Sequence, residues 1–505
     1  MLGTMLTRLR NLLVVACCLV PMPQCATRSP LRLDDPREAA NDLRARHAAA
    51  QGDALQLDAG LDQDIDAFQG LVARGLVERA RLIELARQVH VRIRAGEPIG
   101  AALQHDLTAA LAEALATAGA VFRAAALHEP WLAADGGDDL PELPPRLRAK
   151  GGLLACAGSL FLYDTYLATG AVLADDPVVR RALNQGDLGY GVGRDQLEAV
   201  TLAYHSAFRR AAARRRLAEL ERLRSEIDGL SATDPRSAWL ALLISQSPAR
   251  ERLRVTPVTV LLGHLSTASE VAEDDLVRLS AGSMNTMSSI FGNAVGLVET
   301  RKGRLYGRPE IESVLRQRLQ PGDILLEKTP FRLTDRFIPG HWGHAAIWLG
   351  GEEDLRRLGL WDDPLLAPHR AALAQGRGVC EALRDGVQLN PLGQFLNVDD
   401  CAVLRQPDAD RPAVIRQALR QVGKRYDFNF DVDSADTIVC SELVYTVYTG
   451  IHWPTTRTLG RFTITPDQVA QRALANGPLV TIALWHDGRE ETAPAATLAT
   501  LVPAP

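Results

Sequence analysis

The hydrophobic pattern of the chain changes near residue 300, and this change divides the sequence into two parts with different folds. Residues from about 33 to 285 space their apolar side chains three and four positions apart, as in DIDAFQGLVARGLVERARLIELARQVHVRIRAG, which ends on Gly96. This spacing predicts amphipathic helices, and the glycine is a typical helix end. From Pro321 onward, the short apolar runs GDILLEK, HAAIWLG, GVCEAL and CAVLRQ are separated by turn residues, which predicts strands.

The chain has 505 residues, which is too long for a single hydrophobic core. The pattern therefore predicts an α+β protein with an all-helical domain over 31–290. A compact α+β domain over 305–490 should follow, with helices near Arg411–Val422, from about Val439 and after Pro466, and a final strand LVTIALW. We expect residues 491–505 to be a flexible tail.

One segment of the helical part is long and apolar enough to cross a membrane. It runs from Gly151 to Ala174, and a span needs about 20 apolar residues. Asp164 lies in its middle, where an ionisable group would be costly inside a bilayer. The alternatives are a membrane span and the buried central helix of a helical domain, and the sequence favours the second. The helical part contains no constellation of residues that indicates a chemical function.

The first 25 residues have the pattern of a secretory signal. Arg8 and Arg10 precede the apolar run Leu12–Val20, which is too short to cross a bilayer. Cys17, in VVAC, and Cys25, in PQCAT, are candidates for lipidation; the alternatives are simple cleavage and an uncleaved or wrongly assigned start. Because the basic residues are nearly all arginine, a GC-rich bacterial genome is indicated. We expect an exported protein of the bacterial cell envelope, either periplasmic or anchored to the membrane by lipid.

The composition argues against several classes of function. The formal net charge is -5, whereas nucleic-acid binding requires a basic face. The sequence contains no paired zinc motif of the CxxC type and no Walker phosphate loop. Cys156, Cys380 and Cys401 are either disulfide-bonded or buried free thiols, and the sequence leaves both alternatives open.

Cys440 and His344 are the residues that best indicate chemistry. Cys440 lies in ADTIVCSELVYTVY, where Thr437 is a suitable N-cap, so the cysteine should fall in the first turn of a helix. Unpaired backbone N–H groups and the positive end of the helix dipole favour a thiolate there. His344 opens the apolar strand HAAIWLG. A cysteine nucleophile needs a base within hydrogen-bond reach, and a strand histidine can supply it.

A third group is needed to orient the imidazole, and the candidates are Glu381, His341, Asp427 and Glu442. Glu381 lies in the strand-like segment after the histidine strand. If these two segments pair, Glu381 can reach the histidine while the adjacent Cys380 points the other way. Glu442 is two residues from the cysteine and therefore on another helical face.

His341 and Trp342 precede the histidine strand in GHWGH. A zinc site made by His341, His344 and Cys440 is one alternative. Alternation along a strand puts positions three apart on opposite faces, so we expect no metal site there. His341 is then a loop residue or a substrate contact at the rim of the cleft, and Trp342 either lines the same rim or packs in the core.

The ordered segments PGDILLEK, HAAIWLG, VCEALRDGV, RYDFNF and VCSELVYTVY resemble the circularly permuted papain-fold amidases of the NlpC class, the YiiX/YaeF group. The resemblance covers roughly Pro321 to Gly477, and in this group the histidine precedes the cysteine. It implies a permuted papain-like fold in which Cys440 is the nucleophile, His344 the general base and then acid, and Glu381 the orienting residue.

The resemblance also implies the class of substrate. It allows peptide amides of the cell wall, or N-acyl and lipid-like amides and esters. The cysteine mechanism needs no metal or organic cofactor, and the acidic charge argues against nucleic acid as a partner. The alternative from another class is a non-catalytic interaction or lipid-binding protein of the envelope that uses the papain-like domain as a scaffold.

Overall fold

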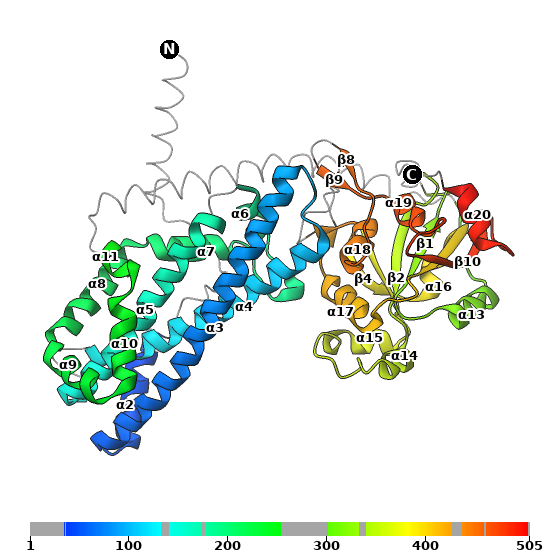
Figure 1. Ribbon diagram of the computed structural model, residues 1–505. Helices are drawn as coiled ribbons and strands as arrows, with labels where there is room; N and C mark the ends of the chain where they lie inside the picture. Colours follow the sequence, from blue (N-terminus) through cyan, green and yellow to red (C-terminus); the bar gives the residue numbers. More distant parts are fainter. Residues whose placement is uncertain are drawn as a thin grey trace, which may run out of the picture. The chain divides into compact units, whose positions relative to one another are not determined.

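The computed structural model of the protein describes residues 35, 37–132, 141–173, 177–253, 301–332, 340–426, 437–458 and 461–502 (Figure 1). Apart from the gaps in this range, residues 35–90, 107–184 and 193–253 form one compact unit, and residues 91–106, 185–192 and 301–502 form another. Two segments of the expected helical domain, Val91–Asp106 and Gln185–Val192, therefore pack with the C-terminal unit. The proposed signal and both lipidation candidates, Cys17 and Cys25, lie outside the described residues.

Helices account for all the regular structure described before residue 254. They are α2 (Glu38–Ala49), α3 (Ala54–Ala95), α4 (Ala101–Leu127), η1 (Glu129–Leu132), α5 (Pro145–Leu173), α6 (Pro177–Asn184), η2 (Leu188–Tyr190), α7 (Gln196–His205), α8 (Ala207–Arg222), α9 (Arg224–Thr233), α10 (Pro235–Ser245) and α11 (Pro248–Arg252).

Helix α5 is the core of the N-terminal unit. Its residues from Ala149 to Ala157 are almost fully buried, and Leu153, Leu154 and Phe161 pack against apolar side chains of α3, α8 and α10. The mid-helix Asp164 accepts a hydrogen bond from the backbone N–H of Ala249 at 2.8 Å. The expectation that this segment is a buried central helix is confirmed. By length and composition alone, one described helical stretch, Ala101–Leu132, would suffice to cross a membrane.

A seven-stranded antiparallel sheet forms the centre of the C-terminal unit. Its strand order is β11-β10-β5-β1-β2-β3-β4. The strands are β1 (Asp323–Lys328), β2 (His344–Trp348), β3 (Val379–Leu383), β4 (Gly386–Asn390), β5 (Asp400–Arg405), β10 (Val480–His486) and β11 (Arg489–Glu490). Two small ladders join β6 (Arg425–Tyr426) to β7 (Thr437–Ile438) and β8 (Thr456–Thr458) to β9 (Arg461–Thr463).

Helices cover both faces of this sheet (Figure 1). The helices are α13 (Pro309–Arg318), α14 (Glu352–Arg357), η4 (Ala367–His369), α15 (Arg370–Ala374), α16 (Leu392–Phe395), α17 (Arg411–Gln421), α18 (Cys440–Val447), α19 (Pro466–Gln471) and α20 (Pro494–Leu501). One face of the sheet, which includes Leu326 and Ile347, packs against α14, α15, α17, α18, α19 and α20. The other face, which includes Leu325 and Trp348, packs against α13 and α16. The expected α+β class is confirmed.

The end of the chain differs from the expected flexible tail. Residues Pro494–Leu501 form α20, and Leu498 and Val502 are buried in the same core as the sheet. Proline in the first turn fixes a helical φ, and the apolar side chains that follow give the helix a face to bury. Burial of this face holds the segment on the domain.

Candidate active site

Cys440 is the first residue of α18 and is 5% exposed. The residue that caps this helix is Val439, and Thr437, the expected N-cap, lies in β7. The carboxylate of Glu442 accepts a hydrogen bond from the backbone N–H of Val439 at 2.9 Å. Glu442, one of the candidates for orienting the imidazole, therefore caps the N-terminus of the cysteine helix instead.

His344 and Glu381 lie on neighbouring strands, as the sequence predicts. Strands β2 and β3 pair antiparallel with Ala346 opposite Glu381, and Nε2 of His344 is 3.0 Å from Oε2 of Glu381. The other carboxylate oxygen of Glu381 accepts a hydrogen bond from the Asn390 side chain at 2.8 Å. The adjacent Cys380 points away, and its sulfur is 3.8 Å from the carbonyl oxygen of Ala418.

The Cys440 thiol and the His344 imidazole share a hydrogen bond and shift each other's pKa in opposite directions. Burial alone would raise the pKa of Cys440, but the charge of His344 and this hydrogen bond lower it below its ordinary value. Backbone hydrogen bonds from Ala345 and Ser441 lower the pKa of the thiol further. Burial alone would lower the pKa of His344, but the charges of Cys440 and Glu327, followed by the hydrogen bonds, raise it well above its ordinary value. The arrangement favours a thiolate–imidazolium pair.

The other described cysteines lack this environment. Cys156, Cys380 and Cys401 are buried free thiols, so the alternative of disulfides among the described cysteines is excluded. Burial raises the pKa of Cys156 to about 12 and raises that of the other two still further. A thiolate at neutral pH is therefore favoured at Cys440 and disfavoured at these three positions.

Two polar residues of this site were not identified from the sequence. Glu327 lies on β1 directly opposite His344 and is 6% exposed, and Asn390 on β4 holds Glu381. A polar residue inside an apolar strand is the signal that marks Glu327 in GDILLEK. Asn390 is the last residue of β4, a segment that was not recognised as a strand from the sequence. Its position next to β3 could therefore not be inferred.

His341 and Trp342 make contacts that differ from those of His344. Nε2 of His341 lies 2.9 Å from Oδ2 of Asp400, so the two histidines contact different carboxylates. Trp342 is fully buried in the core. Of the two alternatives for Trp342, the structure supports packing in the core and not a place at a substrate rim.

The turn that presents these residues is held by Asp467 on α19. Its carboxylate accepts the backbone N–H groups of His341 at 3.0 Å and of Trp342 at 2.8 Å. Gly340 precedes them with φ +104°, and a Cβ on this residue would lie 2.1 Å from a carboxylate oxygen of Asp467. Only glycine fits at this position. Asp427, another candidate for orienting the imidazole, lies outside the described residues.

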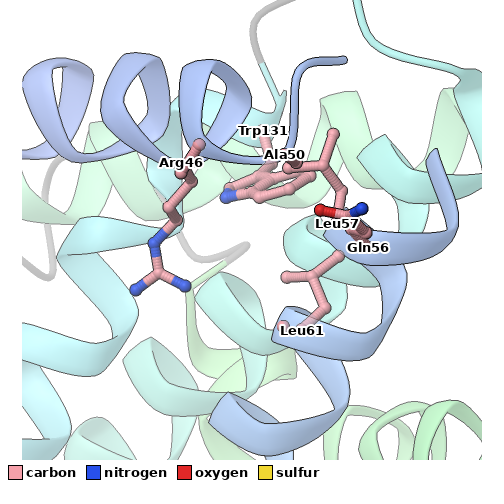
Figure 2. Close-up of a pocket in the computed structure, with 8 residues that line it drawn as sticks. Arg46, Ala50, Gln56, Leu57, Leu61 and Trp131 are labelled. Carbon is pink, nitrogen blue, oxygen red and sulfur yellow. The ribbon is translucent and has the colours of Figure 1, made fainter. Parts of the chain in front are cut away.

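A pocket of about 260 Å³ lies in the N-terminal unit (Figure 2). It is lined by Arg46 and Ala50 at the end of α2, by Leu57 and Leu61 on α3, and by Trp131 of η1. The guanidinium of Arg46 donates hydrogen bonds to the carboxylates of Asp42, at 2.6 Å, and Asp64. None of the residues predicted to act in catalysis lines this pocket.

Comparison with known proteins agrees with the papain-like fold class of the C-terminal domain. No curated protein and no solved structure matches the chain. A family model described as permuted papain-like amidase enzyme, YaeF/YiiX, C92 family, matches residues 318–499. The match begins at the end of α13 and includes the cysteine helix, the histidine strand and the glutamate strand. The C-terminal domain of this chain is therefore similar, over residues 318–499, to the permuted papain-like amidases.

Proposed function

We propose that the C-terminal domain hydrolyses an amide or ester bond through a Cys440–His344–Glu381 triad. The observation that carries the proposal is the paired shift of Cys440 and His344, which lowers the pKa of the thiol and raises that of the imidazole. A thiolate is the reactive form of cysteine, and an adjacent imidazolium is the group that stabilises it. The similarity of this domain to an amidase family supports a cysteine hydrolase of amidase type.

The reaction follows from the protons these groups hold. The Cys440 thiolate attacks the carbonyl carbon, forming a carbon–sulfur bond and an oxyanion. The imidazolium of His344 donates its proton to the leaving amine or alcohol as the scissile bond breaks, which leaves a thioester and a neutral imidazole. That imidazole then takes a proton from water, and the resulting hydroxide displaces the thiolate to release the acid.

Glu381 and the start of α18 assist these steps. The Glu381 carboxylate binds Nε2 of His344, and this contact leaves Nδ1 as the nitrogen that serves the sulfur. The carboxylate thereby sets the tautomer and orientation of the base. The backbone N–H of Cys440, at the first position of a helix, has no intrahelical acceptor and is our proposed oxyanion donor.

For the substrate we propose a peptide amide of the cell wall or an N-acyl or lipid-like amide or ester. This proposal rests on the family, whose members are amidases, and on the signal-like first 25 residues, which would bring an exported enzyme to the envelope. The same residues support a periplasmic or lipid-anchored location.

A panel of peptidyl and N-acyl amides tests the function. Hydrolysis by the full chain should be lost in Cys440→Ala and kept in Cys156→Ala, which removes an equally buried thiol from the other unit. Turnover of any substrate at an unchanged rate by Cys440→Ala would exclude Cys440 as the nucleophile. If no member of either substrate class is turned over by the wild-type chain, the proposed substrate classes are wrong.

A further inference from the structure

Two histidines and one aspartate that play no part in the proposed reaction meet at one end of the C-terminal sheet. His341 lies in the turn before β2, Asp400 is the first residue of β5, and His486 is the last residue of β10. Their donor atoms, two ring nitrogens and a carboxylate oxygen, lie within 4.8 Å of one another. Nε2 of His341 and Nδ1 of His486 are each 2.9 Å from the same oxygen, Oδ2 of Asp400.

We propose that His341, Asp400 and His486 bind a divalent transition-metal ion of the zinc type. Two imidazoles and a carboxylate are a donor set that suits zinc and related first-row ions. Ligand bonds of ~2.0–2.1 Å in a tetrahedral site place donor atoms about 3.3 Å apart. To enclose an ion, each nitrogen–oxygen distance would have to increase from 2.9 Å by about 0.4 Å. The two imidazole nitrogens would have to move closer together.

Neighbouring groups hold Asp400 and His341 in place, as the outer shell of a metal site does. Oδ1 of Asp400 accepts a hydrogen bond from the backbone N–H of Asp487 at 2.7 Å, which leaves Oδ2 directed at the two rings. The backbone of His341 is held by the carboxylate of Asp467 at 3.0 Å. Such outer contacts fix ligands in place and strengthen binding.

Exposure distinguishes this cluster from a closed core network. The side chain of Asp400 is 4% exposed, whereas those of His341 and His486 are 18% and 35% exposed. The carboxylate is thus shielded from water while the rings stay open to it, which gives an ion a route of entry and leaves a coordination position for water or a ligand. An ion here would join the turn before β2 to β5 and β10, and would fix the turn that leads into His344.

Metal binding is best measured in a Cys440→Ala background, because this removes the reactive thiol as a competing ligand. Zn²⁺ titrated against a chromophoric chelator should show one ion bound per chain through this site. His486→Ala and His341→Ala should each weaken that binding by at least about 100-fold, more than the loss expected from removing an outer-shell contact. His452→Ala, which removes an exposed histidine elsewhere in the unit, should not change it.

A second measurement does not depend on the folding of any ligand variant. Co²⁺ added to the Cys440→Ala chain should give the visible absorption of a nitrogen- and oxygen-ligated site, without thiolate charge-transfer bands, and Zn²⁺ should displace it. Absence of saturable binding would overturn the proposal, as would unchanged affinity in folded His341→Ala and His486→Ala chains. None of these readouts uses hydrolytic activity, so the proposal stands or falls independently of the proposed function.

Discussion

His344 and Glu381 contact each other across β2 and β3, with Nε2 of the imidazole 3.0 Å from Oε2 of the carboxylate. The carboxylate is nearly excluded from solvent, with 5% of its side chain exposed, and the ring is 12% exposed. A hydrogen bond in such a dry environment holds the ring more firmly than one at the surface. The orientation of the histidine is therefore determined by the pairing of two strands and not by a flexible loop.

Replacing Glu381 by Gln should reduce kcat while leaving the fold intact. The amide keeps the shape of the side chain but can present a donor to Nε2, which selects the wrong tautomer of the ring. We expect a loss of up to ~10⁴-fold, the effect of the equivalent change in a serine triad, and a smaller loss than in Cys440→Ala. Steady-state kinetics with the best amide of the panel measures both. An unchanged kcat in Glu381→Gln would exclude this residue as the orienting group.

Cys440 should be the thiol that iodoacetamide alkylates first among the four described cysteines at pH 6. Its pKa is lowered by His344, whereas burial raises the pKa of Cys156 to about 12 and that of Cys380 and Cys401 further. His344→Ala should abolish the labelling at pH 6, because an isolated thiol with a pKa of about 8.5 is almost wholly protonated there. Mass-spectrometric mapping of the adducts is the measurement. Equal labelling of Cys380 or Cys401 would contradict the assignment.

Replacing Glu327 by Gln should move the alkaline limb of the kcat/KM profile to lower pH. The charge of Glu327 helps to raise the pKa of His344. Activity requires the protonated imidazolium and is lost as pH rises through this pKa, so removing the charge brings that loss to a lower pH. The expected shift is roughly one pH unit, the scale of one partly screened charge. Glu310→Gln, at an exposed position on α13, is the control and should leave the limb in place. A limb that does not move in Glu327→Gln would show that this carboxylate does not act on the histidine.

Lys424→Met should destabilise the C-terminal unit strongly. Nζ of Lys424 lies 2.8 Å from Oδ2 of Asp187, with side-chain exposures of 3% and 5%. Removing one partner of such a pair leaves a buried charge without compensation, at a cost of about 3–5 kcal/mol. The double variant Lys424→Met, Asp187→Leu should recover much of that loss. Denaturant unfolding followed by tryptophan fluorescence measures the free energies.

The matched control for this measurement is Arg416→Met. Arg416 pairs with Asp363 in the same unit, but its side chain is 45% exposed, and exposed pairs contribute about 0–1 kcal/mol. A loss in Lys424→Met no larger than in Arg416→Met would show that the buried pair does not stabilise the unit.

The mature protein isolated from its native host should lack the first residues. The basic and apolar segments before Pro21 have the pattern of a secretory signal. Intact-mass measurement of the membrane and soluble fractions should find a shortened chain, with acyl groups on Cys17 or Cys25 if it is a lipoprotein. A full-length chain that begins at Met1 in the soluble cytoplasm would refute export.

The sequence predicted the elements that carry the proposed triad because each has a strong local signal. The strands that begin at Asp323, His344 and Val379 are apolar runs bounded by turn residues, and α18 follows from the spacing of Leu443, Val444 and Val447. Pairing of the histidine and glutamate strands was a condition of the predicted contact, and the structure shows that the two strands pair antiparallel.

Contacts between residues distant in sequence were not accessible in this way. The order of β10, β5 and β1 in the sheet depends on tertiary packing, and Asp400 meets His341 and His486 across 59 and 86 residues. A surface role was one alternative for Trp342, because its position in the turn before β2 does not reveal that its backbone N–H binds Asp467 and that its side chain is buried. Burial of this kind is decided by the partner segment and not by the residue's own neighbours.

The inclusion of Val91–Asp106 and Gln185–Val192 in the C-terminal unit determines when that unit can be completed during synthesis. The ring of His105 contacts the carbonyl of Thr446, at the end of the cysteine helix, across 341 residues of sequence, and Lys424 reaches Asp187 across 237. The earlier partner of each pair leaves the ribosome long before the later one. Until the later residue is synthesised, the earlier segments lack these contacts and are open to misassembly, as is common for contacts of high sequence separation. The packing of these two segments is therefore complete only when Lys424 and Thr446 have both been synthesised.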